Sequence, residues 1–194
     1  DAPLDIRIDA DLPAARPRWV PVGDRVESFA LSPTGKRAVF GARGEIFTVP
    51  AEHGDVRNLT RSPAVNDRFP AWSPDGSTVL AVSDADGEYA LDLLGPDGSG
   101  ALERVPMGDP SFYHQPVYDP TGEHIAYADK RMKLWVMDMA THQPVLVDED
   151  LYDHVHQALE LSWSPDGAWL AYTRHLPNHL RAVFLYELAT GQRI

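Results

Sequence analysis

The sequence predicts an all-β protein, a β-propeller of four-stranded antiparallel blades with about four blades in this chain. Two observations carry the prediction: a proline-glycine turn that recurs four times, and the apolar segments that flank each copy. The copies are Ser32-Pro33-Thr34-Gly35, Ser73-Pro74-Asp75-Gly76, Asp119-Pro120-Thr121-Gly122 and Ser164-Pro165-Asp166-Gly167. Their prolines lie 41, 46 and 45 residues apart, which is the period of a four-stranded propeller blade.

Each turn is expected to join the first two strands of a blade. Proline presets the first central residue of a type I turn, and glycine suits the last position. A large apolar residue precedes the copies, namely Leu31, Trp72, Tyr118 and Trp163. Apolar segments follow them at Ala38-Val39-Phe40, Val79-Leu80-Ala81, Ile125-Ala126-Tyr127 and Leu170-Ala171-Tyr172. Such runs predict strands buried on both faces. The recurring aromatic residues, and Trp135 and Trp169 within apolar strands, are therefore expected to pack between blades.

Two further strands complete each unit. Third strands are expected over Glu45 to Val49, Tyr89 to Leu94, Lys133 to Met139 and Arg181 to Leu188. Fourth strands are expected over Val56 to Leu59, Leu102 to Met107 and Pro144 to Asp148. The predicted organisation is a lead-in over residues 1–25, blades over 26–60, 61–107 and 108–150, and a last blade over 151–194 without its outermost strand.

Ring closure leaves two arrangements open. Leu4-Asp5-Ile6-Arg7-Ile8 alternates apolar and polar residues, and such a terminal strand can complete the blade formed by the other end of a chain. A partial ring would expose two apolar blade faces. Either the missing blades belong to the same parent protein, or two copies form an eight-bladed homodimeric ring, with residues 4–8 completing the last blade of their own or the other chain.

Composition excludes several classes of function. Asp and Glu outnumber Lys and Arg by 29 to 17, and the net charge of -12 disfavours nucleic acid and anionic membrane surfaces as partners. No segment approaches the roughly 18 apolar residues of a membrane-spanning helix. The absence of cysteine excludes disulfides and favours a cytoplasmic location, with the periplasm as the alternative. Because the chain starts at Asp1, we expect an upstream segment to precede it.

Longer stretches are more particular than the turns. They include Ala42-Arg43-Gly44-Glu45-Ile46-Phe47-Thr48-Val49-Pro50, Asp129-Lys130-Arg131 and Arg174-His175-Leu176-Pro177-Asn178-His179-Leu180-Arg181. With Arg16-Pro17-Arg18-Trp19 and the first two turns, they resemble the second propeller of bacterial tricorn proteases over almost the whole chain. The Ser-Pro-Asp-Gly turn alone is shared with many propellers, including TolB-like proteins and peptidase propellers, so it indicates architecture only.

The resemblance implies a parent protein that is a large cytoplasmic serine peptidase. Members of that family have two propellers, thought to gate and channel peptides, a PDZ-like domain and a catalytic region. This chain has about four blades where the family's second propeller has seven, and nothing in it resembles the PDZ-like or catalytic parts. The expectation is a non-catalytic scaffold or peptide channel, whose partners are peptides, a catalytic or PDZ-like domain, and further blades or a second copy. The alternative is a free-standing or engineered interaction module that assembles into a closed ring.

Motifs for independent catalysis are absent from the sequence. It contains no Gly-x-Ser-x-Gly elbow, phosphate loop or His-Glu-x-x-His helix, and Ser32, Ser73 and Ser164 are interpreted as structural turn residues. Asp153-His154-Val155-His156 offers only two imidazoles, and Asp84-Ala85-Asp86-Gly87-Glu88 lacks the later carboxylates of a calcium loop. The prediction is therefore that no metal or cofactor is bound.

The candidate binding surface lies on the face opposite the proline-glycine turns. Loops between second and third strands, and the connections between blades, gather there. Its candidate residues are Arg43, Asp67, Arg68, His114, Lys130, Arg131, His154, His156, Arg174, His175, His179 and Arg181. Mixed charge of this kind could hold peptide termini or a partner domain, and a solvated loop surface is the alternative.

Overall fold

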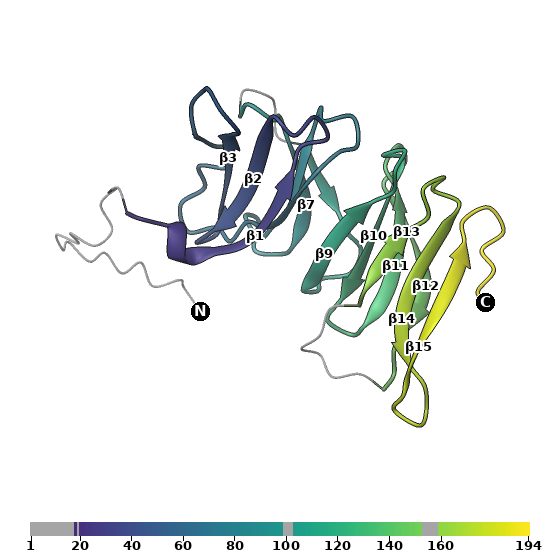
Figure 1. Ribbon diagram of the computed structural model, residues 1–194. Coiled ribbons are helices and arrows are strands. Elements are labelled where there is room, and N and C mark those ends of the chain that lie inside the picture. Colours follow the sequence, from purple (N-terminus) through teal and green to yellow (C-terminus); the bar gives the residue numbers. More distant parts are fainter. Residues whose placement is uncertain (1–17, 19, 99–102, 153–158) are drawn as a thin grey trace, which may run out of the picture.

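Four antiparallel sheets succeed one another along the chain in the computed structural model, which describes residues 18, 20–98, 103–152 and 159–194 (Figure 1). The first sheet contains β1 (Val26–Leu31), β2 (Arg37–Ala42), β3 (Glu45–Pro50) and β4 (Arg57–Asn58). The second contains β5 (Arg68–Trp72), β6 (Val79–Ser83), β7 (Ala90–Leu94) and β8 (Glu103–Pro106). The third contains β9 (Tyr113–Tyr118), β10 (His124–Asp129), β11 (Lys133–Asp138) and β12 (Gln143–Glu149).

The fourth sheet contains three strands, β13 (Leu161–Trp163), β14 (Trp169–His175) and β15 (Arg181–Glu187). The last residues pair with β15 as a short outermost segment. Leu185 and Ile194 exchange two backbone hydrogen bonds of 2.9 Å, and Tyr186 forms an antiparallel β-bridge with Arg193. The predicted closing strand over residues 4–8 lies outside the described residues.

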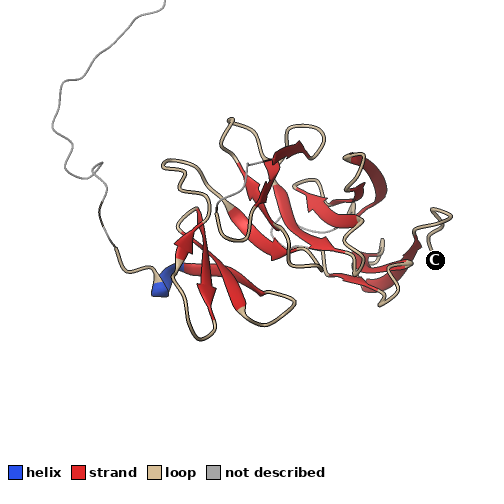
Figure 2. Cartoon of the chain, turned by 90° about the horizontal axis from the view of Figure 1, so that it is seen from above, coloured by secondary structure: helices blue, strands red, loops and turns tan. Residues whose placement is uncertain are grey.

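Strands and loops make up almost all of the described chain. Neighbours within each sheet follow sequence order, as in a meander, which confirms the predicted antiparallel blades. The described helical structure is one 3₁₀ turn over Gly23–Arg25, drawn in blue in Figure 2. Within the described ranges no helix is long and apolar enough to cross a membrane.

The four proline-glycine turns share one hydrogen-bonding pattern. In each copy the glycine N–H donates to the carbonyl of the first turn residue, over 2.8 Å in the first copy and 3.2 Å in the third. The side chain of that first residue accepts the backbone N–H five positions later, as with Ser73 and Thr78 at 3.0 Å, and with Asp119 and His124 at 3.2 Å. Serine and aspartate recur there because both provide this oxygen acceptor.

Three apolar clusters fill the spaces between consecutive sheets. Val39, Ile46 and Leu59 of the first sheet pack with Val79 and Ala81 of the second. Equivalent clusters lie between the second and third sheets and between the third and fourth. Each sheet therefore covers an apolar face of the next, as a propeller requires.

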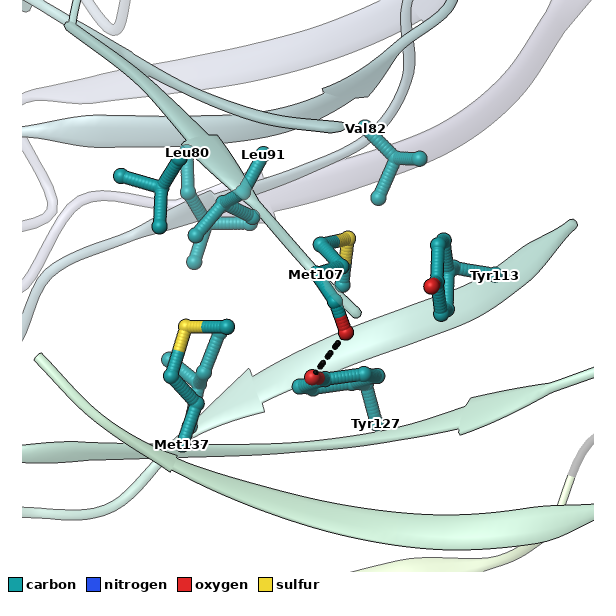
Figure 3. Close-up of a cluster of buried hydrophobic side chains, with 9 residues drawn as sticks. Leu80, Val82, Leu91, Met107, Tyr113, Tyr127 and Met137 are labelled. Carbon is teal, nitrogen blue, oxygen red and sulfur yellow. Dashed lines mark hydrogen bonds between the residues drawn. The ribbon is translucent and has the colours of Figure 1, made fainter. Parts of the chain in front are cut away.

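One polar contact crosses the cluster between the second and third sheets. Tyr127 is fully buried, and its hydroxyl donates to the Met107 carbonyl at 2.7 Å (Figure 3). A buried phenol usually finds such an acceptor. The bond attaches β10 to the segment that follows β8.

The aromatic residues before the second, third and fourth turns pack toward the preceding blade. Trp72 is buried, Tyr118 and Trp163 are half-buried, and the Trp163 indole donates to the Val117 carbonyl at 3.2 Å. Leu31, at the same repeat position, is 67% exposed, because no preceding blade lies among the described residues. Trp135 and Trp169 are half-buried.

Candidate functional site

The innermost strands of all four sheets line one hollow of about 540 Å³. β1, β5, β9 and β13 each contribute to its wall, and β5 contacts both β1 and β9. This convergence identifies the hollow as the axis around which the blades are arranged. The surface is concave, as a binding or guiding site requires.

One repeat position supplies much of the apolar wall. It lies two residues before the large apolar residue that precedes each turn, and it is occupied by Phe29, Pro70, Pro116 and Leu161. Proline has no backbone N–H, so Pro70 and Pro116 remove two donors from the inner edge of their sheets. An edge without these donors resists pairing with an added strand.

The described wall carries one charged residue, Asp119. That carboxylate is 2% exposed and accepts the Gly122 N–H at 2.7 Å and the Thr121 hydroxyl at 2.7 Å. Its negative charge is therefore stabilised by hydrogen-bond donors of its own turn. Phe29 and Leu31, in contrast, are 70% and 67% exposed, so the wall presents mainly apolar side chains.

Arg43 and Asp67, both predicted from sequence as binding-surface residues near the boundary of the first two blades, do not lie together on one surface. Arg43 is exposed in the turn between β2 and β3. Asp67 lies in the interior at 2% exposure, because its N–H donates to the Gly44 carbonyl at 3.0 Å and its carboxylate accepts the Ser62 hydroxyl. It does not contribute to an exposed loop surface.

A second group gathers around Phe112, between the second and third sheets. The Arg68 guanidinium lies 5.4 Å from the Phe112 ring centre, and the His114 ring lies 5.0 Å from it in an edge-on arrangement. Burial lowers the pKa of His114, opposed by the nearby charge of Asp129. The group packs at the junction of the two sheets, and its burial favours the neutral form of the His114 side chain. The adjoining Lys130 and Arg131 are exposed.

A third group joins the third and fourth sheets through two buried carboxylates. Asp148 accepts the Tyr172 hydroxyl at 2.6 Å, Arg174 Nη1 at 3.3 Å and Arg193 Nη1 at 3.0 Å. The guanidinium of Arg174 also stacks 4.4 Å from the centre of the Phe184 ring. Charge-assisted bonds of this kind fix the two blades in register.

Asp150, the other carboxylate, binds the end of β14. It accepts the His175 N–H at 2.7 Å and contacts His175 Nδ1 at 3.0 Å. Arg181 Nε donates to His175 Nε2 at 3.3 Å, and His179 lies edge-on to Tyr152 with ring centres 6.1 Å apart. His154 and His156 lie outside the described residues.

The structure therefore distributes the predicted residues over several places instead of one pocket. Among the described residues, no group of three or more His, Cys, Asp or Glu side chains is placed to hold a metal ion. Sequence reasoning expected a peptide channel but named no residue of its wall, although a signal was present: an apolar residue recurs two positions before Leu31, Trp72, Tyr118 and Trp163.

Comparisons with known proteins agree with the geometry. A family model described as the tricorn protease second beta propeller domain matches residues 26–194. A tricorn protease homolog from Saccharolobus solfataricus is 28% identical over 169 residues, covering 87% of this chain and 15% of that protein. This chain thus spans a small part of that relative's length.

Two solved structures are similar in fold. The crystal structure of the tricorn protease has a TM-score of 0.72 at 16% identity, covering 89% of this chain and 16% of that chain. The structure of TolB from Acinetobacter baumannii has a TM-score of 0.66 at 17% identity, covering 87% and 42%. At these identities the likeness shows the fold alone.

Proposed function

This chain belongs to the family of tricorn protease second β-propeller domains, and from that premise we propose that it is a non-catalytic wall guiding peptides within a larger peptidase. The observation that carries the proposal is the axial hollow lined by the inner strands of all four sheets. The chemistry of that wall suits passage better than tight capture.

Apolar side chains of a peptide would contact the wall without specific polar anchors. The exposed rings and methyl groups of Phe29 and Leu31 favour apolar segments through the removal of apolar surface from water. The two prolines of the inner edges oppose β-strand addition by the passing backbone. Weak, sequence-tolerant contact is what a channel needs, because a tightly bound peptide would not move on.

The turn serines support a non-catalytic role. Ser73 donates its hydroxyl to Asp75 at 2.6 Å, and Ser164 donates to Asp166. Activation of a serine nucleophile requires a neighbouring base that removes its proton and an oxyanion site. A carboxylate in the same exposed turn instead satisfies the hydroxyl structurally.

Peptide binding to the full chain tests the proposal. Fluorescein-labelled peptides of about ten residues, one rich in Leu and Phe and one rich in Asp, would be titrated by fluorescence anisotropy. We expect binding of the apolar peptide alone, weakened about tenfold by a Phe29→Asp, Leu161→Asp double substitution, which is about 1.4 kcal/mol. Leu180→Asp is the matched control, because Leu180 is 63% exposed outside the wall. Equal weakening by the control, or preferred binding of the acidic peptide, would refute the proposal.

Self-assembly into a closed ring is the second candidate, favoured by two bare apolar flanks. The outer face of the first sheet bounds a hollow of about 610 Å³, whose lining includes Val26, Phe47 and Val56. On β15, Val183 and Leu185 are 68% and 40% exposed. Further blades of the parent or a second copy would cover these faces. A solution mass of twice 21.5 kDa would support the second copy, and a monomer at every concentration would count against it.

A further inference from the structure

A small cavity with several polar side chains in its lining interrupts the apolar contact between the first and second sheets. It has a volume of about 120 Å³, and its lining includes Ser62, Asp67, Ser83 and Asp92. Asp67 is 2% exposed, Asp92 is 4% exposed and Ser83 is fully buried. Burying carboxylates away from water is costly unless they are compensated, so this cavity needs a physical explanation.

Asp92 departs from the repeat in which it lies. The residues opposite the fifth position after each turn glycine are Phe47, Asp92, Trp135 and Phe184, paired with Phe40, Ala81, Tyr127 and Tyr172 respectively. Three blades therefore place an aromatic ring at this point of the third strand. The second blade places a carboxylate there, opposite the small side chain of Ala81, and this carboxylate lines the cavity.

The charges around the cavity do not balance among the described side chains. Arg104 binds Asp92 through two bonds, Nε to Oδ1 at 2.8 Å and Nη2 to Oδ2 at 3.1 Å, and it also reaches the exposed Asp86 at 2.7 Å. Asp67 accepts the Ser62 hydroxyl and has no cationic partner in the described part of the chain. Asp67, Asp92 and Arg104 together therefore leave one negative charge in the interior.

Electrostatics at Asp92 agree with this imbalance. Burial raises the pKa of Asp92, the hydrogen bonds and charge of Arg104 oppose the rise, and the neighbouring charge of Asp67 adds to it. A positive charge placed between the two carboxylates would relieve their repulsion.

Ser83 provides an independent sign of a ligand. Its hydroxyl is fully buried in the lining and meets no hydrogen-bond partner of suitable geometry among the described atoms. A side-chain interaction of this hydroxyl with Asp92 lowers the pKa of that carboxyl, but the hydroxyl oxygen itself accepts no hydrogen bond from the described residues. Water would satisfy this oxygen and leave the negative charge uncompensated.

We propose that the cavity binds one monovalent alkali cation, with the Asp67 and Asp92 carboxylates and the Ser83 hydroxyl as its oxygen ligands. Hard cations prefer oxygen donors of these kinds. The volume holds a cation with two or three waters at about 30 Å³ per water. One positive charge neutralises the site, whereas a divalent ion would leave an excess. The ion would link Asp67, which precedes β5, to β6 and β7. Because the Asp67 N–H donates to the Gly44 carbonyl of the first blade, fixing Asp67 would also brace the contact of the second blade with the first.

Thermal unfolding of the full chain at constant ionic strength tests the site. Sodium chloride and potassium chloride would be compared with choline chloride, which screens surface charge equally but is too large for the cavity. Because a ligand of the native state stabilises by mass action, we expect Tm to rise by several degrees with Na⁺ or K⁺ concentration and to saturate. Broadening of the ²³Na resonance by the folded chain would report the bound ion without any substitution.

Substitutions locate the effect. Ser83→Ala removes one ligand with little change in volume, and Asp67→Asn removes the unbalanced charge, so both should abolish the difference between sodium and choline. Ser77→Ala and Asp75→Asn are matched controls in an exposed turn and should retain it. Equal Tm values in sodium, potassium and choline would overturn the proposal and indicate water alone. Stabilisation by millimolar Ca²⁺ without any by Na⁺ or K⁺ would overturn the assignment of a single charge. Neither outcome depends on the proposed peptide channel.

Discussion

The Trp163 indole of β13 donates to the Val117 carbonyl of β9 across 3.2 Å, so a side chain of the fourth blade is bonded to the main chain of the third. Trp163→Phe keeps an aromatic ring but removes the donor. We expect a loss of about 1 kcal/mol in the free energy of unfolding, measured by urea denaturation. Phe29→Ala, at a 70% exposed position, should change it by less than about 0.5 kcal/mol. A larger loss of unfolding free energy in Phe29→Ala than in Trp163→Phe would contradict the importance given to this hydrogen bond.

The second prediction concerns contact between successive turns. Gly122 has a φ of +79°, and a Cβ there would lie 3.2 Å from Cδ of Pro74 in the preceding blade. Gly87 has a φ of +87° and open space around it. Gly87→Ala should therefore lower the free energy of unfolding by about 1 kcal/mol, through backbone strain alone.

Gly122→Ala should cost more than Gly87→Ala, because the Pro74 ring cannot rotate away. Urea denaturation of the two variants, with equal m values, gives the comparison. If both substitutions cost the same, the turns are not packed against one another and the contact of Gly122 with Pro74 has no energetic consequence.

The third prediction tests the buried phenol between the second and third sheets. Tyr127→Phe leaves the Met107 carbonyl without its 2.7 Å donor, and an unsatisfied buried acceptor costs about 1 to 3 kcal/mol. Tyr118→Phe is the control, since no hydrogen bond is formed by the Tyr118 hydroxyl among the described residues. In thermal unfolding, Tyr127→Phe should have a clearly lower Tm than Tyr118→Phe. Comparable destabilisation would mean that ring packing, not the bond, determines the effect.

The blades were predictable because their signals are local. Proline, glycine and an oxygen acceptor within four residues determine each turn, and the apolar runs beside them determine the first two strands. Strand ends were less certain: β7 begins at Ala90 instead of Tyr89, and β11 ends at Asp138 instead of Met139. Such ends depend on where ladder pairing stops, which the local sequence does not specify.

The polar interior was not predictable in the same way. Asp67 was expected on a loop surface, yet it is buried because the segment before β5 packs against the Gly44 turn of the first sheet. The meeting of Arg68 with Phe112 likewise joins two blades through residues distant in sequence. A repeat pattern indicates that blades will pack, but it does not specify which connections meet between them.

The last prediction is a dependence of stability on pH that originates in a turn. The Ser73 hydroxyl donates to Asp75 at 2.6 Å, and the Ser77 N–H and hydroxyl donate to it at 3.0 Å and 2.9 Å. These bonds lower the pKa of Asp75 from 3.8 to about 2, with that of Ser73 the largest contribution.

Because the folded-state pKa lies below the unfolded one, the native state favours charged Asp75. Its stabilising contribution is fully present above the unfolded pKa of about 4 and is lost as the pH falls through about 2. Urea denaturation from pH 5 to pH 2 should therefore show that the native sequence is more stable than Asp75→Asn at pH 5, and that this difference in unfolding free energy shrinks steadily with acid. Ser77→Ala should move the Asp75 pKa, followed by carboxyl NMR, upward toward 3.8. A constant advantage across this range, or an Asp75 titration near 3.8 in the unaltered chain, would contradict the hydrogen-bonded turn as the source.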